Sequence, residues 1–232
     1  WAVFKHESDL NVRIQSTTGL TQQDREEVPE ALRGDLGVGF RYFAHPLALS
    51  LQIEKITPRI RSFTTSVVSL GKEDDVWVGW IDYEITRAGV FRLEIKVPPR
   101  WSWDSVRDPS TAVDYPETID AGGVRTIVLN LKSKALGAFR LPLRLTAPGS
   151  ANPGEATIAP PIVAGSEQDR GLFGVSAPKA IDLSTLEREK MTPADVDELF
   201  RSGIMTQVGA EAGMPLTYSY REQPASVKVK LE

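Results

Sequence analysis

The chain has 232 residues, of which 41% are hydrophobic and 25% are charged. This composition is typical of a globular protein and excludes a disordered or collagen-like chain. Since domains usually hold about 100–200 residues, we expect one large domain or two small ones. The net charge of −4 and the lack of a basic block argue against a nucleic-acid partner. No apolar run reaches about 18 residues, so no transmembrane segment is expected in this chain.

The chain contains no cysteine, which excludes a disulfide framework and any zinc or iron–sulfur site held by thiolates. It begins at Trp1 without a signal-peptide pattern, and we therefore expect it to be part of a longer protein. Its last two residues, Leu231 and Glu232, fit a native sequence and a vector remnant equally well.

Apolar and polar residues alternate along much of the chain, which is the pattern of half-buried strands. Near the N-terminus, residues 21–27 have the composition of a helix start, and Pro29 is expected to end that helix early. A second short helix is predicted near 193–201, with Thr192 as its N-cap and Pro193 at its first position. Strands are predicted where the alternation is clear, at residues 12–14, 47–54, 81–85, 91–97, 126–131, 139–145 and 227–231.

One polar face and one apolar face are typical of strands in antiparallel sheets. The predicted fold class is therefore mainly β: an antiparallel β-sandwich, one large or two small, with one or two short helices. Pro142 cannot donate a ladder hydrogen bond, so its strand is expected at a sheet edge. Trp77 and Trp80 fall on opposite faces of one strand, so one is expected in the core and the other at a contact. Breaks rich in Gly, Pro and Asp separate the strands, at residues 71–75, 88–89 and 120–123.

The Pro- and Gly-containing stretch 146–155 is predicted to be a linker or a long loop. It divides the chain into regions of different expected roles. Residues 1–36 would be the end of a preceding repeat unit, or lead-in strands with a short helix. Residues 37–147 would form a β-sandwich. Residues 156–232 would form a second β lobe, whose last strand resembles the start of a next repeat.

Two segments of the chain resemble each other without gaps at an offset of 178 residues, from Phe40 to Tyr218. Both have a tyrosine two positions after the aromatic start, then a proline, alternating aliphatic residues and a final glutamate. A period near 178 residues suits a whole domain, so we expect slightly more than one period of a tandem array. Pseudo-symmetric halves of one fold and chance similarity of two strands are the alternatives. Each segment follows a short strand pattern and a Thr-x-x-Asp motif, at 12–14 and 21–24 and at 181–183 and 192–195.

Residues 42–97 combine a Leu-rich strand with a Tyr-Glu-Ile-x-x-Ala-Gly-Val-Phe-x-Leu run that leads into Val-Pro-Pro. This part of the chain resembles uncharacterised β-rich repeat modules of very large bacterial envelope and secreted proteins. The resemblance implies an extracytoplasmic location, in the cell envelope or outside the cell. It also implies neighbouring domains of the same polypeptide, or other envelope proteins, as partners, and it transfers no site residue.

Candidate catalytic groups are scarce. His6 and His45 are the two histidines, and the counterpart of His45 in the second segment is Gln223, which argues against catalysis. No nucleophile elbow, phosphate-binding loop or dinucleotide glycine pattern occurs. The acidic run 73–75 lacks the spacing of a calcium loop and fits a solvated turn better. We therefore predict no catalytic residue, no metal site and no cofactor.

Residues 100–120 form the segment whose composition suits a carbohydrate site. Trp101, Trp103 and Tyr115 offer rings on which a sugar could stack, and Asp104 lies beside them in sequence. The competing interpretation, which we prefer, is a long loop whose tryptophans cover the end of the core. Carboxylates that could complete a glycoside hydrolase follow, at Asp108, Asp114, Glu117 and Asp120.

Three functions follow, in order of preference. The first is a non-catalytic structural or interaction module of a larger extracytoplasmic bacterial protein. The second is a carbohydrate-binding domain that uses Trp101, Trp103 and Tyr115. The third is a carboxylate-dependent glycoside hydrolase, which needs two carboxyl groups roughly 5–10 Å apart in one cleft.

Overall fold

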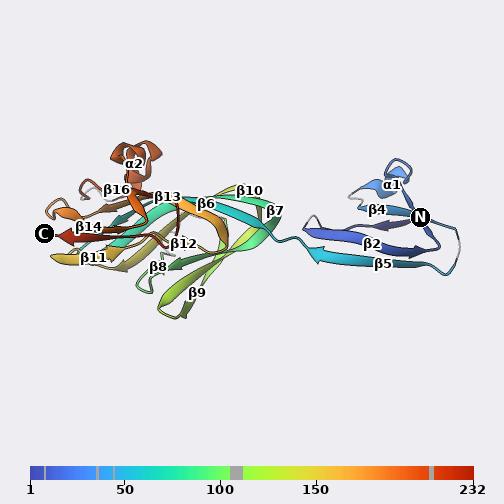
Figure 1. Cartoon of the computed structure of the whole chain (residues 1–232), viewed down its shortest axis with the longest axis horizontal. Coiled ribbons are helices and arrows are strands. Elements are labelled where there is room, and N and C mark those ends of the chain that lie inside the picture. Colours follow the sequence, from blue (N-terminus) through green and yellow to red (C-terminus); the bar gives the residue numbers. More distant parts are fainter. Residues whose placement is uncertain (8, 35–36, 44, 105–111, 209–211) are drawn as a thin grey trace. The chain divides into compact units, whose positions relative to one another are not determined.

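The structure is a computed structural model that describes all residues except 8, 35–36, 44, 105–111 and 209–211 (Figure 1). Among the described residues, strands hold 65% and helices 7%, so the predicted mainly-β class is confirmed. The chain divides into two compact units, unit 1 (Trp1–Pro58) and unit 2 (Arg59–Glu232). Within the described residues, no helix has the length and apolar character needed to cross a lipid bilayer.

Unit 1 contains two small antiparallel sheets, one with the order β1–β4–β3 and one formed by β2 and β5. The helix predicted over 21–27 is wrong, because residues 20–23 form a strand and the helix begins after Pro29. The φ of Pro29 is −52°, and its ring holds φ at a value that suits a helix start. The elements of unit 1 are β1 (Ala2–Phe4), β2 (Leu10–Thr18), β3 (Leu20–Gln23), α1 (Glu30–Arg33), β4 (Val38–Tyr42) and β5 (Ala48–Lys55).

Unit 2 contains a large sheet with the order β15–β16–β13–β6–β7–β10–β8, in which β12 also pairs with β7 and β9 with β10. A smaller sheet has the order β11–β17–β14. Neighbouring strands are antiparallel except β13 and β6, which are parallel. The elements are β6 (Arg59–Ser69), β7 (Asp74–Val97), β8 (Ser102–Trp103), β9 (Val113–Ala121), β10 (Val124–Pro148), β11 (Gly154–Ile158), β12 (Ile162–Val163), β13 (Ser166–Ser176), β14 (Leu183–Glu189), β15 (Met191–Pro193), α2 (Val196–Ser202), a 3-10 turn (Ile204–Gln207), β16 (Leu216–Tyr220) and β17 (Ser226–Leu231).

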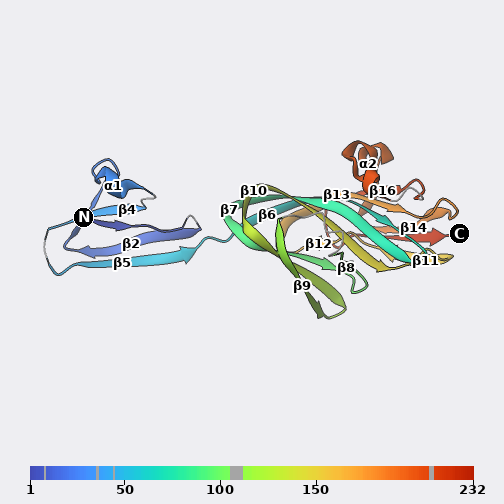
Figure 2. The same cartoon turned by 180° about the vertical axis from the view of Figure 1, so that it is seen from behind.

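Strands β7 and β10 form a long antiparallel ribbon whose register shifts only between Asn130 and Gly137. The break predicted at 88–89 therefore lies inside β7, as an irregularity of the ribbon rather than a gap between strands. Gly137 in this region of β10 has a φ of 80°, which glycine adopts without a steric cost. On the N-terminal side of the irregularity, residues 124–131 of β10 pair with β9 in a hairpin, and residues 125–130 also pair with β7 (Figure 2). Among the described residues, β10 pairs at Pro142 with β7 alone, as expected for an edge position.

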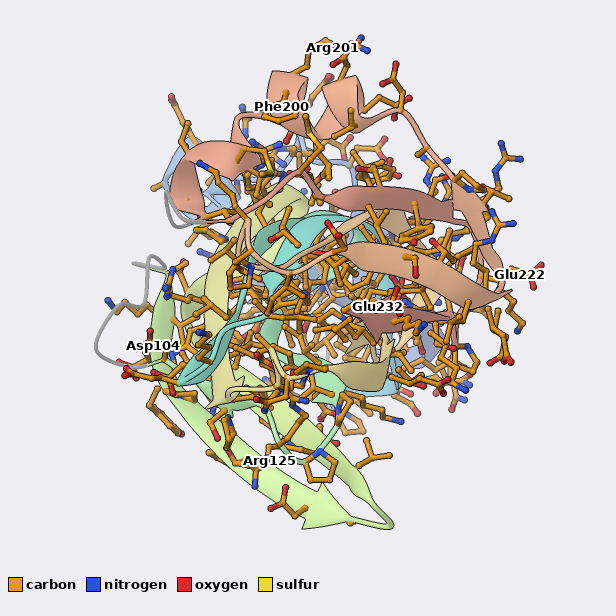
Figure 3. The ribbon with its side chains drawn as sticks, turned by 90° about the vertical axis from the view of Figure 1, so that its left-hand side faces the viewer. Asp104, Arg125, Phe200, Arg201, Glu222 and Glu232 are labelled. Atoms are coloured by element: carbon orange, nitrogen blue, oxygen red, sulfur yellow. The ribbon has the colours of Figure 1, made fainter. Side chains whose placement is uncertain are left out.

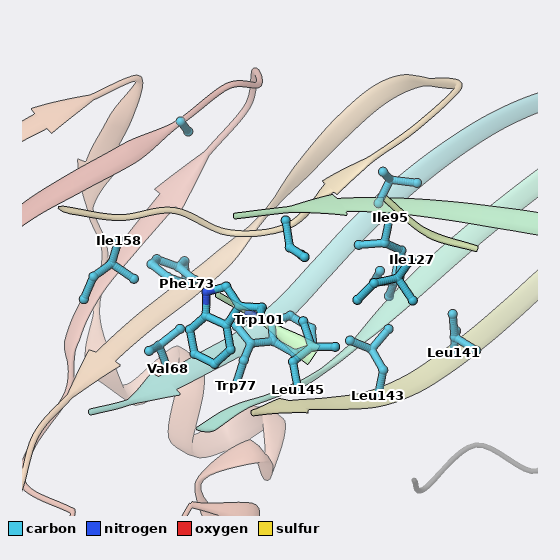
Figure 4. Close-up of a cluster of buried hydrophobic side chains, with 14 of the residues drawn as sticks. Val68, Trp77, Ile95, Trp101, Ile127, Leu141, Leu143, Leu145, Ile158 and Phe173 are labelled. Carbon is cyan, nitrogen blue, oxygen red and sulfur yellow. The ribbon is translucent and has the colours of Figure 1, made fainter. Parts of the chain in front are cut away.

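The core of unit 2 lies between its two sheets (Figure 4). Trp77 and Phe173 of the large sheet and Val229 of the small sheet are at most 1% exposed. A second apolar cluster, in which Leu199 of α2 packs with Val67, covers the other face of the large sheet. Because burying a side chain of this size contributes roughly 1.5–3 kcal/mol, these clusters account for the compactness of unit 2.

Unit 1 has almost no core. Among its described residues, Val28 and Phe40 are the buried hydrophobic side chains. Their burial contributes roughly 1.5–3 kcal/mol each, while ordering the backbone costs roughly 1–2 kcal/mol for every residue. Unit 1 therefore does not have the interior of an independent domain.

The strand pairing of unit 1 occurs a second time at the end of unit 2. Strands β1 to β5 pair with one another as β13 to β17 do, including β1 with β4 and β13 with β16. In the β3–β4 ladder Leu20 lies opposite Tyr42, and in the β15–β16 ladder Met191 lies opposite Tyr220. In both places the β4-like strand is followed by a cis X-Pro peptide, His45–Pro46 or Gln223–Pro224.

The two ladders also share their irregularities. The β2–β5 register shifts between Ile14 and Ser16, and the β14–β17 register shifts between Thr185 and Glu187. Each first strand is joined to the next through one residue with positive φ, Gly19 at 66° in unit 1 and Lys190 at 53° in unit 2. The register shift and the residue with positive φ occur at equivalent positions of the two ladders. The two segments can therefore be aligned residue by residue.

The strand pairing aligns unit 1 with the end of unit 2 more accurately than the sequence comparison did. Residues 1–24 match 172–195 at an offset of 171, and residues 38–54 match 216–232 at an offset of 178. The intervening loop is thus seven residues longer in unit 2, the difference between the two offsets. Val12 consequently corresponds to Leu183, two positions away from the pairing that the sequence suggested.

The compact units do not follow the region boundaries expected at residues 36 and 156. Residues 38–42 pair with β1 and β3 and therefore belong with unit 1. Residues 59–147 and 156–232 share one sheet, because β13 pairs with β6. The helix expected near 193–201 is present as α2, but Asp195 is its N-cap, and Thr192 and Pro193 lie in β15. The Asp195 carboxylate accepts a hydrogen bond from the Asp197 backbone N–H at 2.9 Å.

Candidate functional site

The tryptophans proposed for sugar stacking cover the core. Trp101 is 6% exposed and packs in the sandwich core, with the Arg100 guanidinium 5.3 Å from its ring centroid (Figure 4). Trp103 is half-buried in β8 and packs against the same core. A buried indole presents no free ring face, so Trp101 does not form a stacking platform.

The other two candidate ligand-binding residues, Asp104 and Tyr115, have partners on separate stretches of β10. Asp104 forms an ion pair with Arg144, whose Nε lies 3.2 Å from its carboxylate. Tyr115 is exposed in β9 opposite Asn130, whereas Trp103 lies opposite Leu145. These partners occupy separate stretches of β10, and the structure does not place the four residues on adjacent ladder positions.

Two of the remaining carboxylates of this segment, Glu117 and Asp120, are bound within the β9–β10 hairpin, and Asp114 is exposed in β9. Glu117 accepts a hydrogen bond from the Asn130 side-chain amide at 3.0 Å. Both oxygens of Asp120 accept hydrogen bonds from Arg125 at 2.7 Å, and these bonds hold the pKa of Asp120 below its ordinary value. A glycosidase acid needs the opposite shift, toward a higher pKa. Asp108 lies outside the described residues.

The acidic run 73–75 ends in a buried anchor. Asp75 is fully buried and accepts hydrogen bonds from the Gly71 and Ser150 backbone N–H groups at 2.9 and 3.0 Å. It also pairs with the Arg100 guanidinium. Asp75 therefore ties the loop before β11 to the start of β7, and the solvated turn predicted here is wrong for this residue. Within the described chain, no group of three or more acidic or histidine side chains could hold a metal ion.

A buried carboxyl group that sequence reasoning missed lies in the core of unit 2. Asp169 is 9% exposed and accepts hydrogen bonds from the Val163 backbone N–H at 2.8 Å and from the Ser62 hydroxyl at 3.3 Å. Burial raises its pKa to about 6. Burial also raises the pKa of the Tyr83 and Tyr220 hydroxyls, and the Asp169 charge adds to both shifts. A buried carboxyl group with a raised pKa makes the stability of unit 2 depend on pH.

A groove of 560 Å³ runs between α2 and the large sheet of unit 2. Arg170, Arg221 and Glu198 line it, together with Phe63 and Tyr220. Figure 3 shows the nearby Arg201 on the outer side of the helix. Charges of both signs in an open groove favour no single class of ligand.

Unit 1 exposes side chains whose counterparts in unit 2 are buried. We call Tyr42, Leu47, Leu49, Leu51 and Ile53 the uncovered face. Leu49 and Leu51 are half-buried, whereas their counterparts are fully buried. The exposed fractions of the other three pairs are 46% for Tyr42 against 2% for Tyr220, 39% for Leu47 against 1% for Ala225, and 54% for Ile53 against 2% for Leu231.

Two strand edges beside this face are open. Within the described residues, β5 pairs only with β2, whereas its counterpart β17 pairs with both β14 and β11. Likewise β1 pairs only with β4, whereas β13 pairs with both β16 and β6. Open edges present unpaired N–H and C=O groups, and exposed apolar side chains on a strand with such an edge are typical of an interaction site. The uncovered face with its two edges is therefore the candidate interaction surface of this chain.

Comparisons with known proteins do not identify the chain. No family model and no curated protein matches it. Similar solved structures include an M1 zinc metallopeptidase from Deinococcus radiodurans, as an E323A mutant bound to a Tyr-Ser-Ala substrate, with a TM-score of 0.36 and 7% identity. Another structure of that peptidase has a TM-score of 0.33 and 9% identity. Each match covers 75% of this chain and 42% of the peptidase chain, and TM-scores this low do not establish a shared fold.

Proposed function

We propose that this chain belongs to a non-catalytic structural or interaction module of a larger extracytoplasmic bacterial protein. Unit 2 is one repeat, and unit 1 is the last part of another repeat of the same kind. The observation that carries the proposal is the matching register of the two ladders, with the register shift and the left-handed connector at corresponding positions. Adhesion, spacing and scaffolding are the activities that such an array performs through its surfaces.

Chance similarity accounts poorly for this match. Two unrelated hairpins can share an aromatic start and alternating aliphatic residues, because both are general strand features. They have no reason to share five strands in one pairing order, one interrupted ladder and one connector with positive φ. A common origin of the two segments explains all of these features together.

The test is a longer native chain that continues beyond Glu232. In this chain four residues, 55–58, lie between the counterpart of Glu232 and the first strand of unit 2. We expect a further β6-like strand about four residues after Glu232, at the start of a second sandwich with the topology of unit 2. A continuation with unrelated topology would overturn the proposal.

Folding of unit 2 alone gives an independent test. A protein of residues 59–232 is expected to unfold in one cooperative transition, at the temperature of the main transition of the whole chain. Loss of cooperative unfolding in this shorter protein would show that unit 2 is not a module.

A glycan array separates this proposal from carbohydrate binding. Tyr115 is 52% exposed and Trp103 is half-buried, so these are the rings that a sugar could reach. We expect no glycan to bind the chain or to change its tryptophan fluorescence. Binding that disappears in both Trp103→Ala and Tyr115→Ala would instead favour a carbohydrate-binding domain.

A further inference from the structure

In unit 2, strands β11 and β6 cover the counterpart of the uncovered face. β11 pairs with β17 over its whole length, from Gly154 opposite Leu231 to Ile158 opposite Val227. β6 lies parallel to β13 and contributes Ile60 to the same core. Both covering strands come from residues 59–158, and their places beside β5 and β1 are empty in the described part of unit 1.

We propose that unit 1 binds a lobe equivalent to residues 59–171, supplied by the preceding repeat of the same polypeptide. A β11-like strand of this lobe adds to the open edge of β5, and a β6-like strand adds to the open edge of β1. This inference rests on the proposed function, and it names the partner of the candidate interaction surface.

The residues of β5 indicate which side chains the lobe must present to unit 1. Leu49, Leu51 and Ile53 occupy the positions of aliphatic residues that are buried in β17, so the lobe presents an apolar face to them. On the other side of the strand, Ser50 takes the place of Lys228, which forms a 2.7 Å ion pair with Glu155 of β11. The lobe that fits unit 1 therefore has no need for an acidic residue at the Glu155 position.

A second copy of this chain is a poorer occupant, because its lobe is already engaged. Its β11 is paired with its own β17, and its β6 is paired with its own β13. A second copy could cover unit 1 only after its own ladders separate. A covalently attached lobe with free strand edges pays no such cost.

A fusion protein tests the inference with the whole chain present. Residues 59–171 are added directly before Trp1, because Trp1 corresponds to Leu172 and the junction then continues the β13-like strand without a gap. A second fusion also carries Ala2→Phe, since its counterpart Phe173 is fully buried and alanine would leave a cavity. In at least one fusion, we expect backbone amides of β5 to exchange with deuterium at least about tenfold more slowly than in the chain alone.

A matched pair of substitutions on β5 shows whether the uncovered face makes the contact. Ile53→Asp places a charge on that face, and Gln52→Asp places one on the adjacent, outward side. In the fusion, Ile53→Asp is expected to abolish the added protection while Gln52→Asp preserves it. In the unfused chain neither substitution is expected to change amide exchange of β5 by more than about twofold.

Three results would overturn the inference. The first is unchanged exchange of β5 in both fusions. The second is added protection that survives Ile53→Asp. The third is sedimentation of the unfused chain as a dimer that Ile53→Asp dissociates, which would make a second copy the occupant. The proposed function fails separately, if residues 59–232 alone do not unfold cooperatively.

Discussion

Unit 1 and the end of unit 2 have the same strands in the same register, yet they differ in burial. Ile53 is 54% exposed, and its counterpart Leu231 is 2% exposed. The ladder geometry is therefore specified by local sequence, since it recurs where the core is absent. Burial depends instead on residues 59–158, which supply β6 and β11 to one copy of the ladder and not to the other.

The largest effect is expected from a charge at the two equivalent aliphatic positions. Leu231→Asp buries a carboxyl group in the core and should lower the free energy of unfolding of unit 2 by about 4 kcal/mol or more. Ile53→Asp in the chain alone should change stability by less than about 0.5 kcal/mol, because that position is solvated. Urea unfolding measures both, with Lys230→Gln as the control on the outer side of β17. Equal effects at the two positions would mean that unit 1 is covered already.

Removing the Asp75 carboxylate should weaken the pairing of β17 with β11, so that the edge of β17 becomes more open, as it is in β5. Asp75→Ala leaves Arg100 and two backbone N–H groups without their acceptor, which should cost about 3–5 kcal/mol. Because Ser150 precedes β11, amides on the β11 side of β17 should also exchange faster. Asp82→Ala, which removes a surface ion pair with Arg140, serves as the control and should cost less than about 1 kcal/mol. Unchanged exchange in β17 would show that β11 does not depend on this anchor.

The stability of the two units should depend differently on pH. The pKa of Asp169 is about 6 in the folded protein, above the value of about 3.9 for an unfolded aspartate. The folded state thus binds the proton more tightly, and unit 2 should gain on the order of 2–3 kcal/mol as the pH falls from about 7 to about 4. Urea unfolding at pH 7 and 5 should show part of this gain, and Asp169→Asn should remove it. The segment that unit 1 shares with unit 2 starts after Asp169, so unit 1 should lack the effect. A pH dependence of stability that remains in Asp169→Asn would show that another titratable group causes it.

The smallest effect is expected at the connectors. Gly19 and Lys190 both have positive φ, a conformation that costs a residue with a side chain roughly 1–2 kcal/mol. Gly19→Ala should therefore destabilise unit 1 by about 1 kcal/mol, and Lys190→Gly should stabilise unit 2 by up to about 1 kcal/mol. Thermal unfolding measures the change in unit 2, and amide hydrogen exchange of β2 and β3 measures the change in unit 1. Effects of the same sign would show that the two connectors are not equivalent.

Sequence alone predicted the strands well, because alternation follows from the geometry of a half-buried strand. Val227, Val229 and Leu231 alternate and are buried as expected. Leu49, Leu51 and Ile53 alternate just as clearly but remain partly or largely exposed, because alternation identifies the apolar side of a strand and not the element that covers it.

The candidate site was harder to predict. Aromatic and acidic residues near Trp101 suggested a ligand, but their long-range partners, such as Arg144 for Asp104, cannot be read from local sequence. Asp169 gave no signal either, since its burial results from the parallel pairing of β13 with β6. The similarity of residues 40–54 to residues 218–232 gave the most informative signal, because it allowed the two ladders to be compared.

The two ends of unit 2 lie on strands that are paired on both sides. β6, which begins at Arg59, lies between β13 and β7, and β17, which ends at Leu231, lies between β11 and β14 (Figure 1). Ladder hydrogen bonds run across the strands, so tension applied along β6 and β17 strains many of them at once instead of one after another. A row of such units would resist stretching, as a tether between distant attachment points must.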